Sequence, residues 1–159
     1  MNTKTGELFA VKQVKLVGND KVDKAVVSLS KEITLLQNLK HKNIVLYLGS
    51  ERSENNLNIF MEYISGGSIS TLLSSFGVFS EKIVRIFTRQ ILLGLQYLHS
   101  NQIMHRDIKG GNILVTIDGV VKLADFGAAK KLFTIQTLSS NNQSISGGGA
   151  RTIAGTPHW

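Results

Sequence analysis

The spacing of apolar positions along the chain predicts two helices. The first covers residues 22–39 and the second covers residues 80–99, where apolar side chains recur with helical periodicity. Ser80 is the expected N-cap of the second helix, and Glu81 lies in its first turn. The apolar residues of this second helix cover more than one face, which predicts that it is buried on several sides.

Shorter apolar and β-branched runs predict strands. Residues 50–56 form a polar turn between two of these runs, and Asp118-Gly119 is typical of a tight hairpin turn between the last two. The expected strands are residues 7–14, 44–48, 57–63, 113–115 and 120–123.

Length, charge and cysteine content limit the function classes. The chain has 159 residues, about one domain, and a formal charge of +7 with a pI near 9.8. The positive charge alone would favour nucleic-acid binding. However, the lysines and arginines are scattered and form no nucleic-acid-binding motif, so we do not expect this function. The absence of cysteine excludes disulfides and cysteine–zinc sites and is compatible with the cytoplasmic location that we expect. No run approaches a membrane-spanning length and the polar start is no signal peptide, so we expect no membrane insertion.

Two short strings carry the candidate chemistry. The first is His105-Arg106-Asp107-Ile108-Lys109-Gly110-Gly111-Asn112, and the second is Asp125-Phe126-Gly127, eighteen positions on from Asp107 to Asp125. They match the catalytic loop H-R-D-L-x-x-x-N and the D-F-G of protein kinases, with the expected hairpin between them. Because that hairpin returns the chain, we expect it to bring Asn112 and Asp125 together. The chain therefore resembles a eukaryotic protein kinase.

The resemblance implies a role for each residue of the two strings. Asp107 would accept the proton of a substrate hydroxyl, and Lys109 would contact the γ-phosphate of ATP, as in Ser/Thr kinases. Asn112 and Asp125 would bind Mg²⁺, which prefers oxygen ligands. Any one of these residues alone fits an ordinary loop or turn; their order favours the kinase reading. The remaining members would be structural: His105, Arg106, Phe126 and Gly127, with His105 and Phe126 in a packed column that includes Leu36 and Tyr47.

The first part of the chain is expected to bind the nucleotide. Ala10-Val11-Lys12 resembles the end of V-A-I-K, whose lysine holds the α- and β-phosphates, and Glu32, 20 residues later, would be its glutamate partner. Residues 59–68 resemble the kinase hinge. The alternatives are a solvated strand lysine, a surface glutamate and a buried strand that runs into a Gly-Gly loop. Three hinge positions would line the adenine site: Met61 as gatekeeper, the Glu62 carbonyl and the Ile64 amide.

Residues 134–150 are rich in Ser, Asn, Gln and Gly and lie where a kinase activation loop belongs. Thr152 is the candidate regulatory phosphosite, because a phosphate there could pair with Arg106; the alternative is one exposed hydroxyl among many. Thr156 resembles the threonine that steadies the catalytic aspartate and lysine.

The expected fold is α+β, a two-lobed protein-kinase-like fold that is incomplete, with residues 1–64 as the small-lobe part and hinge and 65–159 as the large-lobe part. No glycine-rich loop precedes Lys12 and no A-P-E motif follows Thr156. Several strings, including Gly155-Thr156-Pro157-His158-Trp159, resemble the MAP kinase kinase kinases. That resemblance implies ATP and Mg²⁺ as cofactors and a MAP kinase kinase as protein substrate, and it leaves the upstream activator open. The alternative is a non-catalytic, kinase-like fragment or pseudokinase that acts as a binding module.

Overall fold

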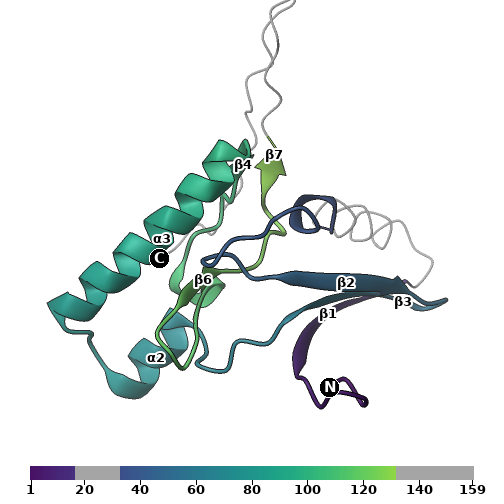
Figure 1. Ribbon diagram of the computed structural model, residues 1–159, viewed down its shortest axis with the longest axis horizontal. Helices are drawn as coiled ribbons and strands as arrows, with labels where there is room; N and C mark the ends of the chain where they lie inside the picture. The colour runs from purple at the N-terminus through teal and green to yellow at the C-terminus, as the bar shows by residue number, and fades with distance from the viewer. Residues whose placement is uncertain (17–32, 132–159) are drawn as a thin grey trace, which may run out of the picture.

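The computed structural model describes residues 1–16 and 33–131, which form one long helix, a shorter helix and three small antiparallel sheets (Figure 1). The arrangement is α+β, as expected. In chain order the elements are β1 (Phe9–Lys15), β2 (Tyr47–Arg52), β3 (Asn56–Glu62), α2 (Ile69–Phe76), α3 (Glu81–Ser100), β4 (Ile103–Met104), a short 3₁₀ helix (Gly110–Asn112), β5 (Ile113–Val115), β6 (Val121–Leu123) and β7 (Lys130–Lys131).

The three-stranded sheet has the order β1-β3-β2, and both pairings are antiparallel. Its central strand β3 matches the expected strand 57–63 closely, and β1 lies within two residues of the expected 7–14. The prediction for β2 is wrong: the strand begins at Tyr47, not residue 44, and continues to Arg52 through the expected turn. The reason is backbone pairing, because polar residues from Ser50 to Arg52 form ladder pairs with β3 and leave their side chains exposed at an edge.

The β5–β6 hairpin is confirmed and lies between the sheet and α3 (Figure 1). Gly119 takes a positive φ of 75° in its turn, a conformation that favours glycine. Both hairpin strands contribute to the main core cluster, whose ten buried members are Leu36, Leu39, Ile44, Leu98, Ile103, Ile113, Val115, Val121, Leu123 and Phe126.

A buried polar contact fixes the hairpin against its neighbours. Asn43 is 4% exposed, and its Nδ2 donates to the carbonyl of Val121 at 2.7 Å and to Oε1 of Gln90 on α3 at 3.2 Å. The amide of Val121 donates to the same Gln90 oxygen at 3.0 Å. The amide of Leu123 donates to the carbonyl of Asn43 at 2.9 Å. Because each of these groups is paired in a low-dielectric interior, the contact holds β6 in one position.

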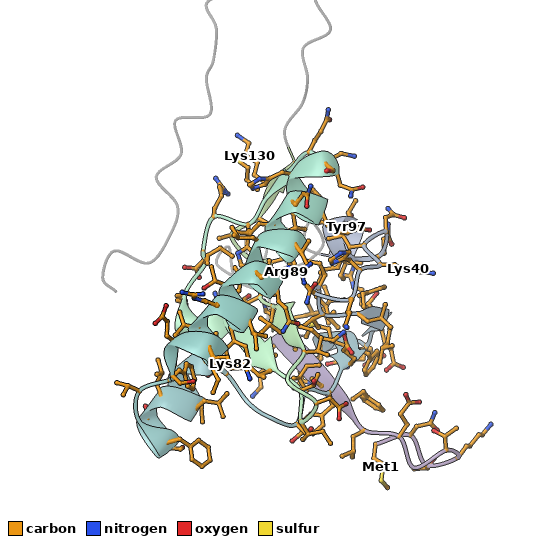
Figure 2. The ribbon with its side chains drawn as sticks, turned by 60° about the vertical axis from the view of Figure 1, so that its left-hand side comes forward. Met1, Lys40, Lys82, Arg89, Tyr97 and Lys130 are labelled. Carbon is orange, nitrogen blue, oxygen red and sulfur yellow. The ribbon has the colours of Figure 1, made fainter. Side chains whose placement is uncertain are left out.

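The long helix α3 begins as predicted, with the Ser80 side chain accepting from the amide of Ile83. Figure 2 shows it along one face of the molecule, with Lys82 and Arg89 on it. Within the described residues, only Gly94 and Leu98 of this helix are buried, and Leu92 is 59% exposed. The expectation of burial on several sides is therefore not met in the described part of the chain. The buried side is the one against β6, where a Cβ at Gly94 would lie 2.9 Å from the Asn43 carbonyl oxygen.

The first expected helix, residues 22–39, lies mostly outside the described residues; its end is helical over 33–36, three residues short of the prediction. Helix α2 and the short pair β4–β7 had no counterpart in the sequence-based expectations. Ser68 caps α2 by accepting from the amide of Thr71 at 3.1 Å, a signal that the chain does contain. The β4–β7 pair joins residues far apart in sequence, with Ile103 opposite Lys131, so no local pattern predicts it.

Candidate active site

Asp107 lies at the centre of the catalytic-loop segment. Its Oδ2 accepts from Nδ2 of Asn112 at 2.9 Å and from Nζ of Lys109 at 3.0 Å. The same Asn112 nitrogen donates to the Asp107 carbonyl at 2.9 Å. The Asp107 side chain is only 15% exposed, so these contacts hold its carboxylate in one orientation. The loop can close in this way because its last residues form the 3₁₀ turn, in which the Asn112 amide donates to the Lys109 carbonyl at 2.9 Å.

The hairpin brings Asp125 back beside this loop, as the sequence predicts. The amide of Ala124 donates to the carbonyl of Asn112 at 2.9 Å. Ala124, the residue before Asp125, therefore lies beside the last residue of the catalytic loop. Asp125 has a φ of 60° and Arg106 a φ of 67°, both in the left-handed region. Such conformations are uncommon for non-glycine residues, and they gather at functional sites.

Asp125 also contacts the three-stranded sheet. Nζ of Lys12 on β1 lies 2.9 Å from its Oδ1, and the amide of Gly127 donates to the same oxygen at 3.4 Å. Partial burial on its own would raise the pKa of Asp125. The Lys12 hydrogen bond and charge, with the Gly127 amide, outweigh that effect and hold the pKa below its usual range. Asp125 is therefore an anionic oxygen donor near neutral pH.

His105 is a packed ring rather than an exposed base. It is 2% exposed, its ring centroid lies 4.9 Å from that of Phe126, and its Nε2 is hydrogen-bonded to the carbonyl of Ala124 at 3.0 Å. Burial lowers the pKa of His105, although the Ala124 carbonyl acts in the opposite direction. Leu36 and Phe126 belong to the same core cluster, Tyr47 packs against that cluster, and His105 contacts Phe126, so the four members of the expected column lie in or beside one core.

Arg106 connects the catalytic loop to the chain after Asp125-Phe126-Gly127. Its Nε donates to the carbonyl of Ala128 at 2.6 Å. With the β4–β7 pairing, this contact holds residues 128–131 beside the start of the loop. Three expected site residues, Glu32, Thr152 and Thr156, lie outside the described residues.

The expected hinge follows β3. Met61 is half-buried and pairs with Ala10 of β1, Glu62 is the last residue of β3, and Ile64 is buried. The structure adds a contact that the sequence did not indicate. The Glu62 carboxylate accepts from Nζ of Lys122 on β6 at 2.7 Å, and nothing in the spacing of these two residues signals the pair.

Comparison with known proteins supplies the family. A family model for the protein kinase domain matches residues 1–159. The chain belongs to the protein kinase domain family. Its fold is accordingly part of the two-lobed kinase fold, and the expected fold class is confirmed.

Several curated relatives of this kinase chain are named MAP kinase kinase kinases. It is 50% identical to mitogen-activated protein kinase kinase kinase 2 of Arabidopsis thaliana over 100% of the chain and 24% of that protein. It is 46% identical to mitogen-activated protein kinase kinase kinase A of Dictyostelium discoideum over 100% of the chain and 16% of that protein. It is 48% identical to mitogen-activated protein kinase kinase kinase 3 of Homo sapiens over 98% of the chain and 24% of that protein. The chain thus spans about a quarter or less of these relatives, and the expected resemblance to their group is confirmed.

The described residues of this kinase chain fit Mg²⁺ bound together with a nucleotide. Because the Asn112 amide nitrogen faces Asp107, its oxygen is directed to the other side of the amide group. The candidate oxygen ligands are then the Asp125 carboxylate and the side-chain oxygen of Asn112, a residue whose backbone carbonyl accepts from the amide of Ala124. Among the described residues no cluster of three or more His, Cys, Asp or Glu could hold a metal by itself. Mg²⁺ typically takes one or two protein oxygens and completes its shell with water and phosphate oxygens, so this small donor set is suited to it.

No helix in the described part of the chain is long and apolar enough to cross a membrane.

Proposed function

We propose that the chain supplies the catalytic residues of a serine/threonine protein kinase, which transfers the γ-phosphate of ATP to a hydroxyl of a protein substrate. The observation that carries the proposal is the fixed Asp107 carboxylate, held by Asn112 and Lys109, in a loop whose backbone pairs with the residue before Asp125. It supports the proposal because Asp107, the proposed proton acceptor, and Asp125, the proposed cation ligand, then lie on adjacent segments, as phosphoryl transfer to a hydroxyl requires.

Each residue has a role in that proposal. Asp107 accepts the proton of the attacking hydroxyl and Lys109 contacts the γ-phosphate. Asn112 and Asp125 bind Mg²⁺, which neutralises charge on the phosphates when it is bound. Lys12 contacts the α- and β-phosphates, and its present position 2.9 Å from Asp125 puts it beside the expected metal ligand. Met61, the Glu62 carbonyl and the Ile64 amide border the adenine. Glu32 remains the proposed partner of Lys12.

The proposed substrate is a MAP kinase kinase, and the proposed setting is a cytoplasmic signalling cascade. The support is similarity to proteins named MAP kinase kinase kinases. Thr152 remains a proposed phosphosite whose phosphate would pair with Arg106, and Thr156 a proposed support for Asp107 and Lys109. The division into a small-lobe part, residues 1–64, and a large-lobe part, residues 65–159, is likewise a proposal.

A second candidate function is a kinase-like binding module without catalysis. The observation in its favour is the Lys12–Asp125 ion pair, in which two groups proposed for phosphate and metal are bound to each other. Such a pair stabilises the site without a nucleotide. Catalysis needs both groups to bind the nucleotide and metal instead.

The test is phosphate transfer from ATP and Mg²⁺ to a generic protein substrate, comparing the chain with its Asp107→Asn variant. We expect transfer by the unaltered chain, and a loss of at least a hundredfold in the variant, since general-base catalysis contributes about 10²–10⁴-fold. Arg85→Met, which removes a charge from an exposed ion pair on α3, is the matched control and should leave transfer unchanged. Equal background for the unaltered chain and Asp107→Asn would contradict catalysis by this chain and favour the binding module.

A further inference from the structure

A second ion pair joins the expected hinge to the strand that leads to Asp125. Nζ of Lys122 lies 2.7 Å from Oε1 of Glu62, and the two side chains are 14% and 26% exposed. The Glu81–Arg85 pair on α3, by contrast, has both side chains 79% exposed. Exposed pairs are screened by water and contribute little. A largely buried pair has high cost when one partner is removed, because the remaining charge is left without compensation.

The Glu62 end of this pair is fixed by the sheet. Oε1 of Glu62 also accepts from the amide of Leu46 at 2.7 Å, while the Glu62 amide donates to the Leu46 carbonyl at 3.0 Å. Glu62 is paired with Phe9 across the β1–β3 ladder as well. The Glu62 carboxylate therefore accepts a hydrogen bond from the backbone just before β2 begins. The carbonyl of the same residue, Glu62, is the one proposed to meet the adenine.

The Lys122 end is fixed by the core. Its neighbours Val121 and Leu123 are both 0% exposed, and it pairs with Leu114 across the hairpin. Asp125 follows three positions later. A short strand that is anchored in the core therefore connects Lys122 to the proposed metal ligand.

The Lys12–Asp125 pair also connects the three-stranded sheet to the hairpin region, but with the charges exchanged: its cation lies on the sheet and its carboxylate lies after the hairpin. Its two members are the groups proposed to bind phosphate and Mg²⁺, so a bound nucleotide competes for both. The Lys122–Glu62 pair uses neither group and can persist through nucleotide binding.

We propose that Lys122 and Glu62 are positioning residues, whose ion pair fixes the position of the hinge relative to Asp125. The pair thereby holds the proposed adenine-binding and metal-binding parts of the site at a constant separation. They touch neither nucleotide nor metal through their side chains. The proposal rests on the proposed function for its nucleotide consequence, while the mechanical coupling between the two segments can be measured without a nucleotide.

The first test is amide hydrogen exchange of the nucleotide-free chain. Lys122→Met removes the charge and keeps the length of the side chain, and Glu62→Gln removes the charge but keeps an oxygen for the Leu46 amide. We expect several-fold faster exchange in both variants at residues 60–64 and again at 123–127, with α3 unchanged. The double variant should be no faster than either single one, because both remove the same interaction. Faster exchange only around the mutated residue, or uniformly along the chain, would overturn the proposal.

The second test is the affinity of the same variants for ATP with Mg²⁺, measured by calorimetry. Lys122→Met should weaken binding about tenfold, which corresponds to about 1.4 kcal/mol. Lys122→Arg, which keeps the charge, should restore most of the affinity, and Arg85→Met on the exposed pair should bind like the unaltered chain. Equal affinity in Lys122→Met and the unaltered chain would overturn the proposal. If the unaltered chain does not bind ATP, the proposed function fails, and the exchange experiment alone decides whether the pair couples the two segments.

Discussion

Leu123 on β6 and Ile59 on β3 are both 0% exposed, but the clusters around them differ in size. Leu123 belongs to a cluster of ten buried residues, whereas Ile59 shares its cluster with one other buried residue, Leu57. The region from His105 to Phe126 therefore holds Asp107, Asn112 and Asp125 on a packed support. The three-stranded sheet presents Lys12 from a ladder that has little buried core of its own.

This difference indicates how the site is assembled. The catalytic loop and hairpin position their side chains through backbone pairing, such as the Ala124 amide on the Asn112 carbonyl, and through the buried Asn43. The sheet is held to them by two ion pairs, Lys12–Asp125 and Lys122–Glu62, and by packing around Tyr47. We infer that the segments carrying Asp107, Asn112 and Asp125, the proposed metal end of the site, are rigid, and that the position of Lys12 depends on fewer contacts.

Truncation of the two buried aliphatic residues should have the largest effect that distinguishes the two regions. Replacement of a buried Leu or Ile by Ala costs about 2–5 kcal/mol, and the cost is larger where neighbours cannot collapse into the cavity. We expect Leu123→Ala to lose about 4 kcal/mol of unfolding free energy and Ile59→Ala about 2 kcal/mol. Urea unfolding measures both values. An equal loss, or a larger loss for Ile59→Ala, would contradict the difference between the two regions.

A smaller effect is expected from pH at His105. Because burial lowers the pKa of this ring in the folded chain, the unfolded chain, with a pKa near 6.5, takes up the proton first as pH falls. Stability should therefore decrease below about pH 7, by at most about 1.4 kcal/mol per pH unit from this group. Once the pH is below the pKa of His105 in the folded chain, this group causes no further loss of stability.

The measurement is the unfolding free energy at several pH values, with His105→Phe as the variant. That variant keeps a ring beside Phe126 but cannot titrate, so its stability should fall less steeply as pH decreases. His99→Gln, at an exposed position near the end of α3, is the control and should keep the steeper dependence. The same steepness in the chain and in His105→Phe would show that this ring is not the titrating group.

Local signals predicted the parts of the site that are close in sequence. The two motifs predicted the catalytic loop, and the Asp118-Gly119 turn predicted the hairpin that brings Asp125 back beside this loop. The start of α3 followed from the Ser80 cap. The turn, the loop and the helix start depend on backbone conformations and hydrogen bonds within about twenty residues, so local sequence could predict them, whereas the position of the hairpin also depends on the distant Asn43.

The parts that escaped prediction are pairings between distant segments. The Lys122–Glu62 pair and the Asn43–Gln90–Val121 contact join residues whose types are ordinary for a strand, a loop or a helix. The extension of β2 through Ser50 and Glu51 was missed because partner backbone, rather than side-chain pattern, maintains it. Tertiary context determined all three.

We propose that the sheet and the hairpin together form one magnesium-dependent nucleotide site. The most direct measurement is calorimetric titration of the chain with ATP, with and without Mg²⁺, beside its Asp125→Asn and Lys12→Met variants. We predict binding that Mg²⁺ strengthens, loss of that strengthening in Asp125→Asn, and weaker binding in Lys12→Met whether or not Mg²⁺ is present. Binding that is unaffected by Mg²⁺ and equal in all three chains would contradict a magnesium-dependent site formed by the sheet and the hairpin.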